Sequence, residues 1–489
     1  MVQRGQYWAV LAMVCLSSGV VLRAAEQDMM KQLMDRVNAL EAKNAELERR
    51  ANATQSTSVA VDEAIKKAED TQAAVNVTSS RPIKIGGYID SSFQYNFNQP
   101  KNQNNNLRGF DTDSNGYNLH LAELTFDSLP TKVCEAGFRM DLAFGTDTRL
   151  FKALDHTTFA PERTNDFVDS DMKQAYIEYI MPIPFLCDST KGIKCDMGKF
   201  VTWAGFETIE GADNFNSSRS FLFTYAIPFT HTGARMTYDV LTRDCNKWTI
   251  GAAAYNGWDN TQDQNRGKTY ALYSDWTPTK WFEMVNTGII GQEQSRDNRL
   301  TFLLATDAAS GGDPTDPTTP GFQQLHKGDT LLGQLDGGRD SQLNTSKDKR
   351  ARMLLDSTLI FKPFCNNKLI LALNGDIASE GGSKWYGAAG YAKYQFAKRW
   401  SFSLRAEYFN DVDGARTGIR QVLTEGTATL NYNFTDELQA RLEFRHDHSN
   451  KGVFDDGKGG TTGTGGPNLN NPFDRKTQNT VMYSWLYKF

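Results

Sequence analysis

From Ile83 to the C-terminus, apolar and polar side chains alternate in short segments of about ten to fourteen residues, the pattern of strands with two different faces. The last segment, "VMYSWLYKF", places Val481, Tyr483, Trp485 and Phe489 on the same face. Counting all such segments predicts about sixteen strands. Their expected starts lie near residues 83, 116, 136, 171, 193, 229, 247, 268, 281, 350, 367, 383, 399, 421, 436 and 475.

The connections between these segments are largely short and long in turn, which is typical of a membrane barrel whose two ends face different compartments. Short examples are "PTKVCE", "TRDCNK" and "TDEL". The long ones span residues 99–115, 148–170, 204–228, 293–349 and 449–474. A soluble sandwich or propeller has no reason to sort its loops by end in this way.

The chemistry of the two strand faces indicates which solvent each one meets. One face carries aromatic and aliphatic side chains, and the other carries Arg, Glu, Asp, Asn and Gln. An apolar interior enclosed by about sixteen strands would be too wide for side chains to fill. Lipid outside and water inside satisfies both faces, and closure leaves no unpaired edge in the hydrocarbon. We therefore predict an all-β, antiparallel transmembrane barrel over residues 81–489, closed between the last strand and the strand near residue 83, with a soluble all-β fold as the alternative.

Two segments precede the predicted barrel. Arg4, the apolar run Tyr7–Leu22 and the small pair Ala24-Ala25 predict a signal peptide over residues 1–25, with an uncleaved anchor helix as the alternative. Residues 26–78 contain an unbroken heptad frame that starts at Met30 and runs to Val75 without Gly or Pro. This frame predicts an α-helical coiled coil in the periplasm, and a single solvated helix or a disordered tether remains open.

Composition removes several classes of function. The net charge is −5 and the Lys and Arg residues are scattered, so the sequence has no basic cluster of the kind that binds nucleic acids. A charged fraction of 23% and a mean hydropathy of −0.53 exclude a helical membrane protein. Cys187 and Cys195 flank one predicted turn and are the candidate disulfide in an oxidising compartment. No cysteine has metal-ligand spacing with the six histidines, so neither a metal nor another cofactor is expected.

One stretch carries a more specific signal. Residues 198–235 read "GKFVTWAGFETIEGADNFNSSRSFLFTYAIPFTHTGAR". The pieces Gly198–Phe200, Asn214–Phe223 and Pro228–Gly233 resemble the signature of the OmpL-like outer-membrane porins, the second family of β-barrel porins. The resemblance extends over residues 83–489. It implies a barrel in the outer membrane of a Gram-negative bacterium that conducts small solutes, and it supplies no catalytic or ligand residues. A coiled coil before the barrel also resembles several trimeric porins, which implies a homotrimer.

The third long loop, residues 204–228, is the first candidate site. In general porins the third loop folds into the lumen and sets the constriction, and here it would supply opposed charges from Glu207, Glu210, Asp213 and Arg219. A capping loop packed over the rim is the alternative. Strand alternation points a second, pore-lining set into the lumen: Arg139, Asp141, Glu178, Arg235, Asp239, Arg405, Glu407, Arg441, Glu443 and Arg445. Cross-strand structural ion pairs are the alternative for these residues, and a slip of one residue would reverse any assignment.

The residue pattern does not favour an enzyme. His231 and Asp239 share a strand face but lie eight residues apart, and no His or Asp can be assigned beside Ser217, Ser218 and Ser220. The sequence therefore predicts a porin whose partners are outer-membrane lipids and small hydrophilic solutes or ions. The alternative is a structural protein that tethers the membrane to peptidoglycan through its coiled coil.

Overall fold

The computed structural model describes residues 43, 81–101, 103–151, 170–183, 191–261, 263, 267–293, 351–457, 473 and 475–489. The chain divides into two compact units, Met1–Ile83 and Lys84–Phe489, and the second unit is described below. The expected signal peptide, the expected coiled coil except Lys43, and Cys187 of the expected disulfide all lie outside the described residues.

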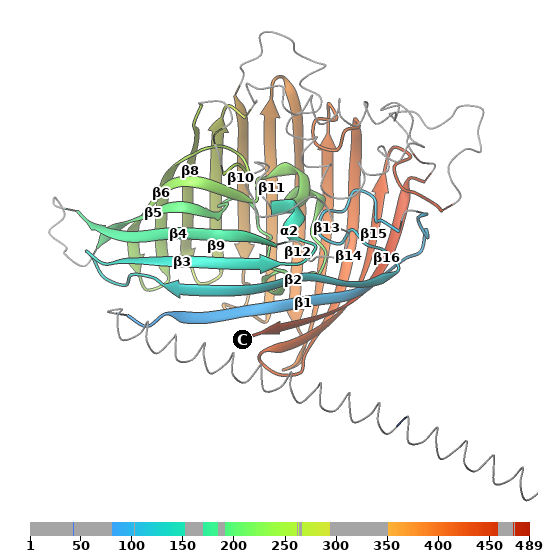
Figure 1. Ribbon diagram of the computed structural model, residues 1–489, viewed down its shortest axis with the longest axis horizontal. Coiled ribbons are helices and arrows are strands. Elements are labelled where there is room, and N and C mark those ends of the chain that lie inside the picture. Colours follow the sequence, from blue (N-terminus) through green and yellow to red (C-terminus); the bar gives the residue numbers. More distant parts are fainter. Residues whose placement is uncertain are drawn as a thin grey trace, which may run out of the picture. The chain divides into compact units, whose positions relative to one another are not determined.

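The described part of Lys84–Phe489 is built from sixteen strands (Figure 1). The first eight are β1 (Lys84–Asn96), β2 (Gly116–Ser128), β3 (Ala136–Phe144), β4 (Ser170–Pro182), β5 (Gly192–Val201), β6 (Thr230–Arg243), β7 (Asn246–Tyr255) and β8 (Thr269–Thr279). The others are β9 (Phe282–Gly291), β10 (Arg352–Phe361), β11 (Leu369–Glu380), β12 (Ser383–Gln395), β13 (Trp400–Asp411), β14 (Gln421–Asn433), β15 (Leu438–Ser449) and β16 (Thr477–Lys488). Three short helices accompany them: α2 (Thr148–Phe151), η1 (Gly211–Asp213) and η2 (Leu222–Ala226). Each strand begins within two residues of its expected start.

Every strand pairs antiparallel with its sequence neighbours, and β1 pairs with β16 to close the barrel. The first and last strands lie side by side in blue and red in Figure 1. The terminal residue completes this seam, because Phe489 and Gly87 exchange backbone hydrogen bonds of 3.0 and 3.1 Å. The predicted closed antiparallel barrel, its strand number and its closing pair are confirmed.

The two wall faces have the polarity that the alternation predicts. Along β13, Leu404 is 46% exposed on the outside, whereas its neighbours Ser403 and Arg405 are 0% and 2% exposed on the inside. The outward rows of β1 and β16 expose Ile89, Tyr483 and similar large apolar side chains. Burial in lipid is favourable for such rows, and polar groups need the wet interior.

Aromatic rings gather near the short-turn ends of the outer wall. Trp400 packs on Tyr432 with ring centroids 4.5 Å apart, and Phe434 stacks on Trp485 at 5.2 Å. Amphipathic aromatic rings favour the boundary between lipid and water. The opposite end carries the long loops, with one exception. β11 and β12 are joined there by Gly381-Gly382, whose φ angles of 56° and 96° allow a two-residue turn.

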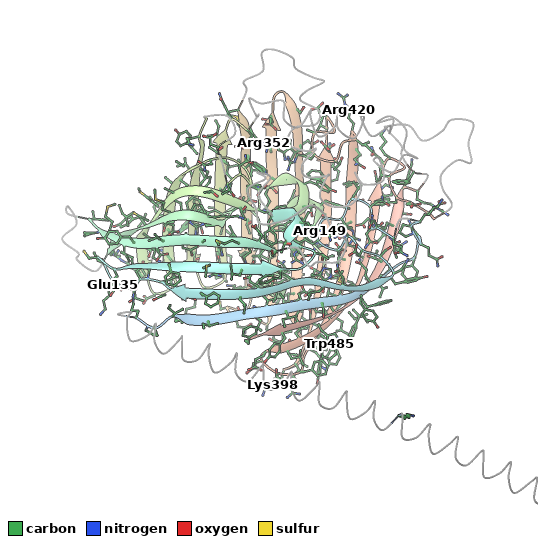
Figure 2. The ribbon with its side chains drawn as sticks, viewed as in Figure 1. Glu135, Arg149, Arg352, Lys398, Arg420 and Trp485 are labelled. Carbon is green, nitrogen blue, oxygen red and sulfur yellow. The ribbon has the colours of Figure 1, made fainter. Side chains whose placement is uncertain are left out.

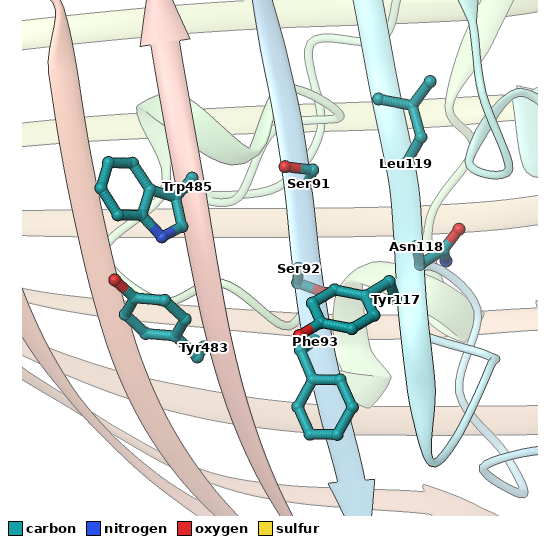
Figure 3. A pocket seen from close by; sticks show the side chains of 8 residues that line it. All are labelled: Ser91, Ser92, Phe93, Tyr117, Asn118, Leu119, Tyr483 and Trp485. Atoms are coloured by element: carbon teal, nitrogen blue, oxygen red, sulfur yellow. The ribbon is translucent and has the colours of Figure 1, made fainter. Parts of the chain in front are cut away.

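A hollow lies near the seam on the described part of the outer wall. A groove of about 470 Å³ lies over β16, β1 and β2 and is lined by uncharged side chains, including Phe93, Tyr117 and Trp485 (Figure 3). Its floor is the small side chain of Ser91, next to a bulge in the β1–β2 ladder. The groove is part of the lipid-facing surface, and none of its lining residues is charged.

Candidate functional site

The segment between β5 and β6, residues 202–229, contains η1 and η2 and is called the lumen loop below. It leaves the barrel wall at β5 and reaches β13, which lies eight strands away in either direction around the barrel. Hydrogen bonds join it to the inner faces of β12, β13, β14 and β15. The lumen loop therefore crosses the interior and docks on the opposite wall.

Two wall glutamates hold the backbone of the lumen loop. Glu443 on β15 accepts hydrogen bonds from the backbone N–H groups of Ser217 at 2.6 Å and Ser218 at 3.0 Å. Glu407 on β13 accepts the N–H of Phe221 at 2.7 Å and that of Leu222. Each carboxylate thus binds two consecutive amides, an arrangement in which charge strengthens both hydrogen bonds.

Wall arginines hold the carbonyl groups of the same segment. Arg405 donates to Ser218 O at 2.6 Å, and Arg445 donates to Arg219 O. Arg441 donates to Gly211 O at 2.9 Å. The glutamates of the inner wall thus bind backbone N–H groups of the loop, and the arginines that alternate with them along β13 and β15 bind its carbonyl groups.

The candidate charges of the loop itself have unequal surroundings. Glu207 is buried and accepts from Ser220 N at 2.8 Å and from Arg405 at 2.6 Å. Arg219 is buried and donates to the carbonyl groups of Thr208, Ser217 and Ile209. These two side chains brace the loop internally and do not face open space.

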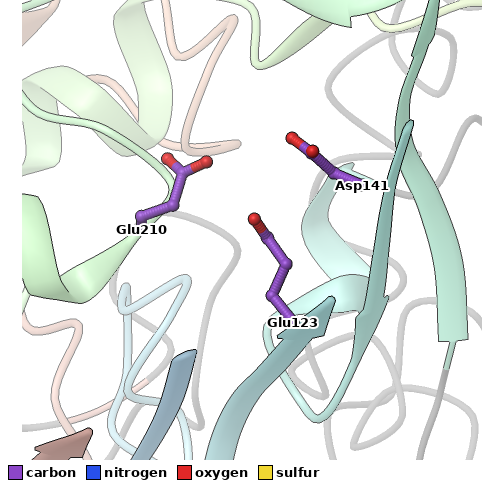
Figure 4. A group of neighbouring side chains, drawn as sticks. All are labelled: Glu123, Asp141 and Glu210. Carbon is purple, nitrogen blue, oxygen red and sulfur yellow. The ribbon is translucent and has the colours of Figure 1, made fainter. Parts of the chain in front are cut away.

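Glu210 belongs to a cluster of charges between the loop and the near wall. The Lys173 ammonium contacts Glu210, Glu123 at 2.6 Å and Asp141 at 3.6 Å. Figure 4 shows the three carboxylates converging from β2, β3 and the loop. Their oxygens lie within 4.8 Å of one another, a spacing that could hold a cation. In this structure the Lys173 ammonium lies among the three carboxylates, and Asp141 also pairs with Arg139.

Asp213 is the candidate loop charge that is exposed in the lumen. It forms an ion pair with Lys488 at the end of β16, and both side chains are about half exposed. Because salt and solvent screen such a pair, it holds the loop weakly. Its carboxylate therefore remains accessible to solvent.

The rest of the pore-lining set also lies on the inner wall. Arg139 pairs with Asp141 at 3.0 Å, and Arg235 pairs with Asp196 at 2.7 Å while its guanidinium lies 4.2 Å from the ring centre of Phe200. For the remaining two, the described ranges show no such ionic partner. Glu178 is half-buried beside Asp196, and Asp239 is exposed and accepts from Thr249 at 2.8 Å. Of the ten residues, Arg405, Glu407, Arg441, Glu443 and Arg445 are occupied by the lumen loop and are nearly inaccessible.

An apolar core lies inside the barrel and is supplied largely by the lumen loop. Phe221, Leu222, Phe223 and Tyr225 are all buried. Tyr225 stacks near Phe409 of the wall at 6.0 Å between ring centroids. Burial raises the pKa of Tyr225 well above its usual range, because desolvation disfavours the phenolate.

Two other long loops fold inward over this core. Arg108, from the loop after β1, binds Asp447 of β15 at 2.6 Å. Arg416, from the loop after β13, donates to Tyr225 O at 2.5 Å and lies 5.2 Å from the ring centre of Trp385. The long-loop end of the interior is therefore densely packed around the lumen loop.

The sequence reasoning missed Lys173, although a signal was present. Strict alternation from Ile177, Tyr179 and Met181 would point Lys173 into lipid, where an ammonium is costly. A bulge between β3 and β4 turns it inward beside Gln174. A lysine in a lipid-facing register is thus a signal for a bulge.

None of the helices in the described ranges is long and apolar enough to cross a membrane. Among curated protein sequences, none matches the chain.

Solved structures that resemble the chain are outer-membrane barrels. The outer membrane channel DcaP of Acinetobacter baumannii is 8% identical with a TM-score of 0.46, covering 83% of this chain and 97% of its own. The anion-selective porin from Comamonas acidovorans is 8% identical with a TM-score of 0.42, covering 83% and 99%. The trimer form of OmpT from Vibrio cholerae is 10% identical with a TM-score of 0.45, covering 84% and 100%.

The family comparison agrees with the closed barrel and with the motif in the lumen loop. Residues 82–489 match the family described as "Putative beta-barrel porin-2, OmpL-like", and the chain therefore belongs to this family of outer-membrane barrel porins.

Proposed function

We propose that the protein is a water-filled channel for passive diffusion of small hydrophilic solutes across the outer membrane, with the lumen loop as its constriction. The observation that carries the proposal is the loop's path: it crosses the interior of a barrel whose inner wall is polar and whose outer wall is apolar. A loop held by charged wall residues narrows the bore, and its apolar side chains are buried against the wall and the other long loops. Solutes then pass beside the loop, where charges such as Asp213 meet them.

Conductance of the purified full-length protein in planar bilayers tests the proposal. Stable single-channel steps in potassium chloride are expected, together with uptake of small but not large sugars by proteoliposomes. Asp213→Asn should shift the ratio of cation to anion permeability, because Asp213 is exposed. Glu207→Gln and Glu210→Gln should instead alter the size or noise of the steps, because these residues hold the loop. Absence of conductance in correctly folded protein would refute the channel.

The proposed assembly is a homotrimer with residues 26–78 as a periplasmic coiled coil behind a cleaved signal peptide. The heptad frame of the sequence supports this arrangement. The same frame supports the alternative role, a tether to peptidoglycan. Deleting residues 26–78 separates the two roles, since a channel should still conduct, whereas a tether should lose its association with the cell wall.

A further inference from the structure

The lumen loop presents aromatic rings to the bore on the side toward the short-turn end. Phe206 and Phe215 are both half-buried, with ring centroids 5.3 Å apart. Phe206 also packs on Tyr391 of β12 at 4.6 Å. Both rings pack against the apolar core at its edge, and their exposed parts offer contact area to a planar apolar group.

A lysine stands next to these rings. Lys393 points inward from β12, three residues before the turn to β13, and its Nζ lies 5.2 Å from the ring centre of Phe215. Its neighbours in register are Ile370 and Ser403, which carry no charge. Within the described ranges no carboxylate forms an ion pair with Lys393. The ammonium is therefore held beside the rings without a negative partner.

The charges that act on Lys393 are also positive. They belong to Arg441 and Lys488, on β15 and β16. The guanidinium of Arg441 is hydrogen-bonded to the neutral carbonyls of Gly211 and Asn216. Lys488 has its own partner in the exposed ion pair described above.

The acids that interact with Arg441 are already engaged elsewhere. They are Asp90, Glu443 and Asp213. Glu443 is occupied by the loop amides and by Thr429, and Asp213 by Lys488. The surroundings of Lys393 therefore favour an anion.

We propose that Lys393, Phe206 and Phe215 form a binding site for aromatic carboxylates in the bore. The carboxylate lies against the ammonium, and the ring of the solute packs on the phenylalanines. The inference rests on the proposed channel function and names a solute class for it. Binding at such a site is weak, since a transported solute must leave again.

The test uses the full-length protein and benzoate. In planar bilayers, benzoate should reduce the potassium chloride current in a saturable manner, whereas acetate, without a ring, and benzyl alcohol, without a charge, should do so far less. Lys393→Gln should raise the half-blocking concentration at least about tenfold, as expected for the loss of one charged hydrogen bond. Lys398→Gln is the matched control, because Lys398 is exposed in the turn between β12 and β13 (Figure 2) and should change it less than about twofold.

Saturation-transfer NMR of the detergent-solubilised protein measures benzoate binding without conductance. Binding that is lost in Lys393→Gln and kept in Lys398→Gln supports the site even if no current flows. Conductance without saturable block or NMR binding overturns the site and leaves the channel intact. Equal effects of the two substitutions also overturn it, because a general change of surface charge would then explain the result. Phe215→Leu, which keeps the charge, should weaken benzoate and leave acetate unchanged.

Discussion

Replacing Glu443 by glutamine should release part of the lumen loop while leaving the barrel folded. Three donors converge on the carboxylate: the N–H groups of Ser217 and Ser218, and the hydroxyl of Thr429 at 2.8 Å. Glutamine retains one acceptor oxygen, and its NH₂ group cannot accept from the second amide. At least one buried amide therefore loses its partner, and the remaining bonds lose their charge.

The size of the effect follows from these bonds. A hydrogen bond to a charged group contributes about 1.5–3 kcal/mol, and an unsatisfied buried amide costs about 1–3 kcal/mol. The local free energy that keeps residues 217–218 seated should therefore fall by about 2–4 kcal/mol, which raises the open population about 30- to 1,000-fold. The strand ladder is unchanged, so the barrel itself should remain folded.

Hydrogen exchange measured by mass spectrometry checks this expectation. Peptides covering residues 214–224 should exchange faster by about that factor, and the single-channel current should become larger or noisier. Glu437→Gln is the control, because Glu437 lies in the exposed turn between β14 and β15. Unchanged exchange in the loop peptides of the Glu443→Gln variant would contradict the anchoring role of this carboxylate.

Three further predictions concern the wall. Lys173→Met leaves three carboxylates without the lysine ammonium, so the melting temperature measured by differential scanning calorimetry should fall. Millimolar calcium should restore part of the lost melting temperature in the variant and should not raise that of the wild type. Gly87→Ala places a methyl group 2.1 Å from a backbone oxygen of β2, so it should destabilise the barrel by about 1–3 kcal/mol in urea, whereas Gly426→Ala, with nothing within 4 Å, should not. Leu404→Arg, on the lipid face, should cost about 2–4 kcal/mol in lipid vesicles, more than Leu404→Ala, and equal losses for the two would contradict the outward orientation.

The barrel could be predicted from the sequence because its two signals are local. A period of two residues identifies a strand and its faces, and turn residues identify its ends. The polarity of the faces, as at Ser403, Leu404 and Arg405, then selects lipid outside and water inside. The closing pair follows as well, since a membrane barrel has no free edge.

The destination of the lumen loop could not be predicted in the same way. The sequence indicates that Glu407 and Glu443 face inward, but it does not indicate that each binds two amides of a segment about two hundred residues away. The residues that join a loop to the barrel wall do not recur at a regular spacing in the sequence, so no periodic pattern identifies them. Bulges add a second difficulty, because one extra residue reverses the faces beyond it, as at Lys173.

A local departure from the inner-wall pattern nevertheless marks where the loop docks. Trp385, Phe409 and Leu423 occupy inward positions near the long-loop ends of β12, β13 and β14, and all three are fully buried. In an open aqueous bore these side chains would expose apolar surface to water at an unfavourable free energy. Their burial therefore requires apolar partners from elsewhere in the chain. η2 of the lumen loop packs on the strands of Trp385 and Phe409, and Leu423 belongs to the same apolar cluster. An apolar row on the inner face of such a barrel predicts a docked segment, just as a charged residue on its outer face predicts a bulge.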